Sequence, residues 1–165
     1  MTEIKVEHIP IGAVRENPLN NAIFNSLAPE KYEALKQYIR KTGLLKPVIV
    51  NGENVLLAGH ERLKICKELG HATIPVQRID LGDAEKEQEF LIKDNLLSRS
   101  LSPVEIGKAG LHLEAIVRRM PKPPKNVRDV VAKTLGLSSF QYAKIKTVLL
   151  MGGEDLVHRM DRGEV

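Results

Sequence analysis

The sequence contains little of what covalent or metal-based frameworks need. Cys66 is the only cysteine among 165 residues, which excludes an internal disulfide and a cysteine-based metal site. The five histidines show no paired ligand spacing. Cys66 itself falls among the apolar positions of an expected helix, so we expect it to be a small buried hydrophobe.

Long apolar runs are also missing. No stretch approaches the roughly 20 residues of a membrane span, and the N-terminal MTEIKVEHIP has no signal-peptide core. Tryptophan is absent, yet 42% hydrophobic and 28% charged residues are typical of a folded soluble protein with a modest core. The sequence therefore predicts a cytoplasmic protein without a membrane partner. The formal net charge of +4 permits a polyanionic partner without requiring one.

The first eighty residues are expected to form a small α/β unit. Alternating apolar residues, glycine caps and a turn at NGEN provide the signals. Pro75 predicts that the last strand lies at an edge or an irregular position. The expected order is a strand over residues 3–9, a loop over ENPLNNAIFNS, a helix over 29–42, a hairpin of LLKPVIV and VLLAG, a helix over 60–69 and a strand in ATIPVQRID.

After Asp80 the pattern becomes helical. Asp83 can cap the helix that follows it, and Ser102 with Glu105 forms a capping box that opens a helix to about Arg119. The basic, proline-rich MPKPPK is the clearest linker. We therefore predict an α/β domain over residues 1–82, connecting helices over 83–120 and a helix-turn-helix region over 121–165.

The helix-turn-helix prediction depends on a small residue and a glycine. Ala132 lies four residues before Gly136, as two helices meeting at a tight turn require. An ordinary helical hairpin would give the same spacing. Basic residues crowd this region, and Asp129 is the only acidic residue over 115–151, which favours contact with DNA phosphates. The predicted DNA-binding residues are Arg128, Ser138, Ser139, Gln141, Tyr142, Lys144 and Lys146.

The stretch LLAGHER predicts an anion site. The apolar run reads as a strand that stops at Gly59, and an amphipathic helix begins directly after it. The first backbone N–H groups of a helix have no partner within the helix, so a helix that starts at a strand end attracts anions there.

Three segments, met in this order, together resemble the ParB family of DNA-partition proteins. GLLKPVIV at residues 43–50 is similar to the family's Gly-x-x-x-Pro-Ile segment. AGHERLKICKELG at 58–70 is similar to its Gly-Glu-Arg-Arg box. DNLLSRSLSPVEIGKA at 94–109 is similar to its Glu-Asn-Leu-Gln-Arg motif and the Leu-Asn-Pro-x-Glu that follows. With the helix-turn-helix behind them, the resemblance covers about residues 17–150.

The resemblance implies a ParB/sulfiredoxin-like α/β domain with a small mixed sheet, followed by an all-α helix-turn-helix domain. It also implies CTP with Mg²⁺ in the first domain, weak CTPase activity at most, double-stranded DNA as a partner, a homodimer and a ParA-like ATPase partner in the nucleoid or on a plasmid. No separate C-terminal dimerisation domain is expected within these residues. Carried over by position, the nucleotide-binding residues are Gly43, Leu44, Lys46, Pro47, Gly59, His60, Glu61, Arg62, Asn95 and Arg99, and the metal residues are Asp94 and Asn95.

The sequence departs from the family in both phosphate motifs. His60 and Glu61 stand where the family has Glu and Arg, and Leu97 and Ser98 stand at its Gln and Arg positions. His60 also replaces the catalytic cysteine of the related sulfiredoxins, which excludes their chemistry. Two alternatives therefore stay open. One is a nucleotide-dependent enzyme of this superfamily, either a phosphotransferase resembling free-serine kinases or a nuclease using groups such as Glu61. The other is a transcriptional regulator without a nucleotide, in which Arg62 pairs with a carboxylate such as Glu105.

Overall fold

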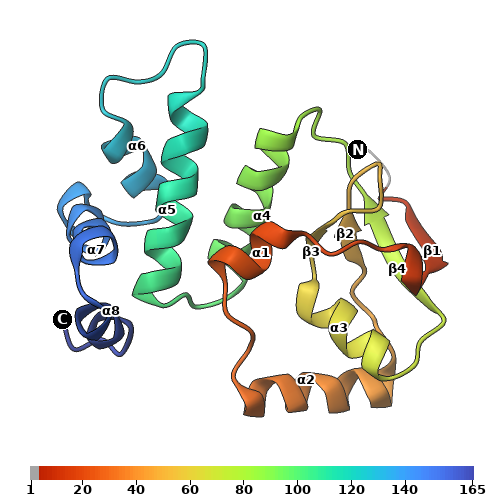
Figure 1. Ribbon diagram of the computed structural model, residues 1–165. Helices are drawn as coiled ribbons and strands as arrows, with labels where there is room; N and C mark the ends of the chain where they lie inside the picture. Colours follow the sequence, from red (N-terminus) through yellow and green to blue (C-terminus); the bar gives the residue numbers. More distant parts are fainter. Residues whose placement is uncertain (1–3) are drawn as a thin grey trace. The chain divides into compact units, whose positions relative to one another are not determined.

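The computed structural model describes residues 4–165, which divide into two compact units, one ending at Leu91 and one beginning at Ile92. The elements of the first unit are β1 (Val6–Pro10), η1 (Ile11–Ala13), α1 (Pro18–Ile23), α2 (Pro29–Thr42), β2 (Val48–Val50), β3 (Leu56–Ala58), α3 (His60–Glu68) and β4 (Thr73–Arg78) (Figure 1). The boundary falls within α4 (Ala84–Ser98). The second unit continues with α5 (Pro103–Arg118), α6 (Val127–Thr134), α7 (Ser139–Met151) and α8 (Glu154–Asp161).

The strands form one mixed sheet in the order β1-β4-β2-β3. β4 is antiparallel to β1 and parallel to β2, and β2 and β3 form the expected hairpin. The prediction of an edge position for Pro75 is wrong, because β4 lies inside the sheet. Pro75 lies opposite His8 and one residue before Val76, the first β4 residue paired with β2, so the missing N–H falls just outside that ladder.

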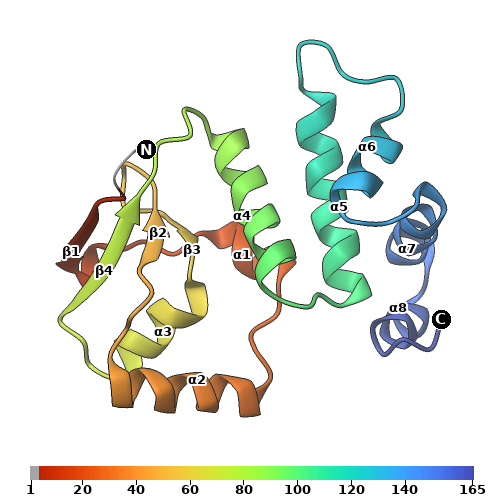
Figure 2. The same cartoon turned by 180° about the vertical axis from the view of Figure 1, so that it is seen from behind.

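α2 and α3 pack against this sheet and against each other (Figure 2). The core combines Ile39 from α2, Leu63 and Cys66 from α3, and strand residues such as Val48 and Val76, all buried. The predicted burial of Cys66 is confirmed. The helix over residues 29–42 is confirmed as well, with Pro29 in its first turn and Gly43 at its C-terminal cap.

Two further predictions for the first unit need correction. The segment ENPLNNAIFNS contains α1 rather than only a loop, because the side chain of Asn17 accepts a hydrogen bond from the Leu19 N–H and Pro18 occupies the first helical position. The first strand begins at Val6 rather than Glu3, and Glu3 lies outside the described residues.

The second unit is organised around α5, which packs against α6, α7 and α8. Its capping box between Ser102 and Glu105 is present as predicted. Two glycines let α7 approach closely. A Cβ on Gly110 would lie 2.3 Å from the ring of Tyr142, and one on Gly107 would lie 3.0 Å from Ile145. α5 is therefore the packing centre of this unit.

α6 and α7 lie where the sequence predicts them. Leu135 to Ser138 connect them, Gly136 has φ +72°, and the N–H of Leu137 donates to the carbonyl of the buried Ala132 at 2.9 Å. The helix α8 was not predicted. Among residues 4–165, no helix is long and apolar enough to cross a bilayer.

Candidate functional site

The GHER turn joins β3 directly to α3. Gly59 forms the N-cap of α3 with φ +100°, a left-handed conformation that favours glycine. A Cβ at this position would lie 2.7 Å from Cγ1 of Val48 and 3.0 Å from Nη2 of Arg62. The turn therefore requires glycine for two independent reasons, its backbone conformation and its lack of space.

Arg62 connects this turn to the segment before β2. Its Nη1 donates to the carbonyl oxygen of Lys46 at 2.8 Å and to that of Pro47 at 2.7 Å. Two segments that the resemblance assigns to one nucleotide pocket are thus held together. Glu105, named as a candidate partner of Arg62, accepts a hydrogen bond of 2.7 Å from Arg99.

A cavity of about 310 Å³ is lined by two residues of this turn, His60 and Glu61. Within residues 4–165 its lining combines the start of α3 with α1 and the chain on either side of α1, which the sequence did not predict to take part. The polar run NPLNN between a strand and a helix was the available signal. The lining residues are Glu16, Asn20, Asn21, Ser26, His60, Glu61 and Lys64.

Two residues of this lining, His60 and Glu61, have side chains in unusual environments. Nε2 of His60 and Oε2 of Glu61 are buried and have no hydrogen-bond partner among the described residues. The other oxygen of Glu61 accepts a bond of 3.3 Å from the Leu27 N–H. Burial lowers the pKa of His60 to about 4, so the imidazole is neutral at pH 7. Because His60 is neutral, the positive charge in this lining comes from Lys64.

The other predicted nucleotide and metal residues come from both units. Gly43 caps α2, and Leu44 packs against the core of the first unit. Asp94 and Asn95 are half-buried on α4, in the second unit with Arg99. No group of three histidine, cysteine or acidic side chains that could hold a metal occurs among the described residues.

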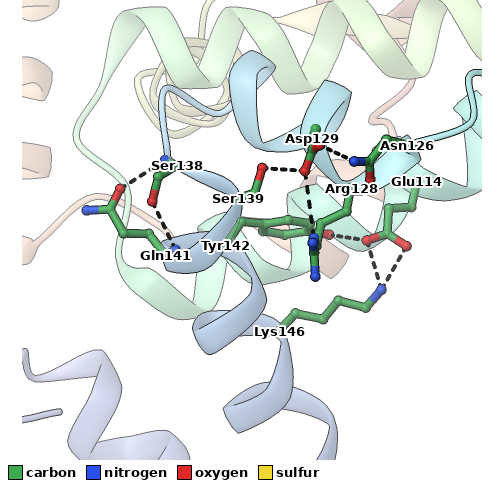
Figure 3. A network of polar contacts seen from close by, with 9 residues as sticks. All are labelled: Glu114, Asn126, Arg128, Asp129, Ser138, Ser139, Gln141, Tyr142 and Lys146. Atoms are coloured by element: carbon green, nitrogen blue, oxygen red, sulfur yellow. Dashed lines mark hydrogen bonds and ion pairs between the residues drawn. The ribbon is translucent and has the colours of Figure 1, made fainter.

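The predicted DNA-binding residues gather around the start of α7, where a polar network ties α7 to α6 (Figure 3). Ser138 and Gln141 form a capping box with bonds of 3.1 and 2.9 Å. The hydroxyl of Ser139 donates to Asp129, which also accepts from Asn126 and forms an ion pair with Arg128. These polar groups therefore fix the first turn of α7.

A second cluster fixes α7 to α5 through Glu114, which is buried. The Tyr142 hydroxyl donates to Oε1 of Glu114 at 3.0 Å, and Nζ of Lys146 donates to both carboxylate oxygens at 2.8 Å. Burial would raise the pKa of Glu114, but the bonds from Lys146 and Tyr142 outweigh it and hold that pKa below its usual range.

Tyr142 requires a correction as a DNA-binding residue. Its side chain is fully buried, because the missing side chain of Gly110 makes room for the ring, so it cannot reach DNA in this structure. Lys146 is committed to Glu114 and only partly exposed. By contrast, Arg128, Gln141 and Lys144 are exposed.

The comparisons with known proteins agree with this architecture. A family model described as the ParB N-terminal domain matches residues 1–96. A probable chromosome-partitioning protein ParB from Helicobacter pylori is 29% identical over 154 residues, which cover 88% of this chain and 51% of that protein. The chain thus spans about half the length of this curated relative.

Three solved structures share the fold at low sequence identity. A Pnob8-like ParB N-domain has a TM-score of 0.66 at 20% identity and covers 100% of this chain and 78% of its own. Truncated ParB from Caulobacter crescentus, complexed to the centromeric parS site, has a TM-score of 0.59 at 20% identity. The match covers 96% of this chain and 79% of the Caulobacter chain. The same protein complexed with CTP-gamma-S has a TM-score of 0.50 at 22% identity. The match covers 97% of this chain and 86% of that one. With the family model matching more than half of its residues, the chain belongs to the ParB N-terminal domain family.

Proposed function

We propose that this chain is a DNA-binding protein of the partition type, with a nucleotide site at the GHER turn. The observation that carries the proposal is the order of its parts. A ParB N-terminal domain over residues 1–96 is followed by two helices joined at a four-residue turn, within a strongly basic region.

The charge distribution around α6 and α7 supports DNA binding. The exposed cations here face little competing negative charge, since Asp129 is the only acidic residue over 115–151. Such an arrangement suits the phosphate backbone, whose contacts dominate affinity. The exposed basic side chains are those of Arg118, Arg119, Lys122, Lys125, Arg128, Lys133 and Lys144.

Fluorescence anisotropy with labelled duplex DNA over a salt series tests this function. We expect tight binding at low salt, and we expect Lys144→Gln to lower the slope of log K against log salt by about 1, because one phosphate contact is lost. Lys31→Gln removes an equal charge from an exposed position on α2 and serves as the matched control. An absence of binding at low salt would overturn the proposal.

Nucleotide binding is supported by the anion-attracting start of α3, the adjacent cavity and Lys64 in its lining. The Caulobacter relative complexed with CTP-gamma-S makes CTP the first nucleotide to test. Glu61 opposes a phosphate at this place, because two negative charges repel each other unless a cation lies between them.

Asp94 and Asn95 fit a magnesium site by their chemistry. A carboxylate and an amide oxygen are hard donors, and Mg²⁺ in proteins is commonly held by one or two carboxylates together with substrate phosphates. We propose that these two residues hold the ion, which would supply positive charge.

Calorimetry with CTP, ATP and ADP, with and without Mg²⁺, tests the nucleotide site. We expect Lys64→Gln to weaken CTP binding and Glu61→Gln to strengthen it, because the amide keeps an oxygen for the Leu27 N–H but removes the negative charge. Lys31→Gln again controls for net charge. If none of the nucleotides binds even with DNA present, the regulator without a nucleotide is the better description.

A nucleotide-dependent enzyme is a second candidate, favoured by the two unpartnered atoms of His60 and Glu61 in the cavity. Phosphate release and nuclease assays on the same samples test it. We also propose a homodimer, because helix-turn-helix proteins usually read two half-sites, and a ParA-like ATPase partner. Sedimentation with and without DNA checks the dimer, and a binding titration with a ParA-like ATPase checks that partner.

A further inference from the structure

Phe140 is a large aromatic side chain that the second unit does not use in its core. Its side chain is 79% exposed on the second residue of α7. Tyr142, two residues later, points the other way and is fully buried against α5. Burial of a phenylalanine side chain stabilises a fold or a complex, so an exposed ring is available to bury apolar surface against a partner.

The ring stands on a firmly held part of the helix. Ser138 and Gln141 close a capping box around it, and Ser139 bonds to Asp129 of α6 (Figure 3). One turn further on, Tyr142 and Lys146 bond to Glu114 of α5. Polar contacts on both sides of Phe140 therefore hold the stretch of α7 from which it projects.

Cations outnumber carboxylates on this part of α6 and α7, where Asp129 bonds to Ser139 and pairs with Arg128. Lys144 follows Phe140 by four residues, so the two side chains share one face of α7, and both are exposed. Arg128 and Lys133 are exposed on the neighbouring α6. A partner for this face must offer an apolar contact within a strongly negative surface.

The major groove of DNA offers that combination. Its walls carry the phosphates, and its floor presents one apolar group, the C5-methyl of thymine, which side chains such as Phe contact. Residues at the start of a recognition helix are those that meet base edges. We propose that Phe140 contacts thymine methyl groups in the major groove and so determines part of the DNA sequence that this protein prefers. This inference rests on the proposed DNA-binding function.

The test removes the methyl group and the ring in turn. Duplexes are first enriched from a random pool by the wild-type chain. Each thymine of the enriched site is then replaced singly by deoxyuridine, which lacks only the C5-methyl. We expect a roughly 4-fold loss of affinity at one or two positions in each half-site, the factor that corresponds to burial of one methyl-sized group. Phe140→Ala should lose a similar factor on the thymine duplex and become insensitive to deoxyuridine at those positions.

Met151→Ala is the matched control, because Met151 is 82% exposed at the opposite end of the same helix. It should leave the deoxyuridine pattern unchanged, and urea unfolding confirms that both variants fold. If the wild type binds no duplex, the proposed function itself fails. If it binds but shows no methyl dependence, or if Phe140→Ala keeps the same dependence or weakens all duplexes equally, this inference is overturned.

Discussion

The hydroxyl of Tyr142 donates a hydrogen bond of 3.0 Å to Glu114, on the face where α7 packs against α5. Because Lys146 and Arg118 also donate to this carboxylate, a buried negative charge is fully engaged at the helix contact. Such a group is costly when unpaired, so it favours the one arrangement of α7 on α5 that satisfies it.

Gly110 should be irreplaceable in this contact. We expect Gly110→Ala to lower the free energy of unfolding of the second unit by about 1–3 kcal/mol, because the new Cβ would lie 2.3 Å from the Tyr142 ring. Urea unfolding followed by circular dichroism measures the change. Gly52→Ala, where a Cβ meets nothing within 4 Å, is the control. Equal stability of the two variants would contradict the close approach of the helices.

The N-terminal cap of α7 should stabilise the second unit independently of the contact at Gly110. Ser138→Ala removes the acceptor for the Gln141 N–H, and we expect a loss of about 1 kcal/mol. The same unfolding experiment measures it, with the exposed Ser100→Ala as a matched control. A loss no larger than that of Ser100→Ala would show that the capping box contributes nothing.

We expect Arg99 to stabilise the folded protein, whether or not it also contacts a nucleotide. It bonds at 2.7 Å to Glu105, whose side chain is only 4% exposed. Arg99→Gln would remove this ion pair from a buried carboxylate, so we expect a loss of roughly 3 kcal/mol. Arg40→Gln, on the exposed surface of α2, should change little. Thermal unfolding of both variants distinguishes a structural arginine from one held only for ligand binding.

His60 should make the protein acid-sensitive in a defined range. Its pKa is about 4 in the folded chain, against an ordinary value of 6.5, so the unfolded chain binds the proton more readily. The stability it contributes is complete above pH 6.5 and is lost as the pH falls toward 4, by up to roughly 3 kcal/mol. Urea midpoints at pH 7, 5.5 and 4.5 should fall for the wild type.

His60→Asn should flatten that pH profile, while His8→Asn, on the exposed face of β1, should reproduce the wild-type slope. An unchanged profile for His60→Asn would mean that the imidazole is not buried in its neutral form.

Local signals explain what the sequence predicted well. Pro29 and Gly43 mark the two ends of α2, and the capping boxes mark the starts of α5 and α7. Each of these signals involves residues within one turn of the helix end, so no distant contact is needed to interpret them.

Long-range packing explains what the sequence did not predict. The cavity beside His60 takes more than half of its lining residues from α1 and its flanks, some forty residues earlier. A tyrosine at position 142 is compatible with a buried face of α7 and with a DNA-binding face. Gly110 on α5 makes room for its ring, so the side chain lies on the buried face. Neither fact can be read from one segment alone.

The place of β4 in the sheet has a consequence for the order of folding. Val6 pairs with Gln77 and Pro10 with Thr73, so the hairpin and both larger helices of the first unit are synthesised before β1 finds its partner. Pairing between segments so far apart is slow, whereas the helices of the second unit join near neighbours. Because β4 lies between β1 and the hairpin, a nascent chain that stops before Thr73 lacks the strand that joins β1 to β2, and the segment after β1 meets the hairpin only through backbone bonds of Arg15 to Asn54 and Leu56.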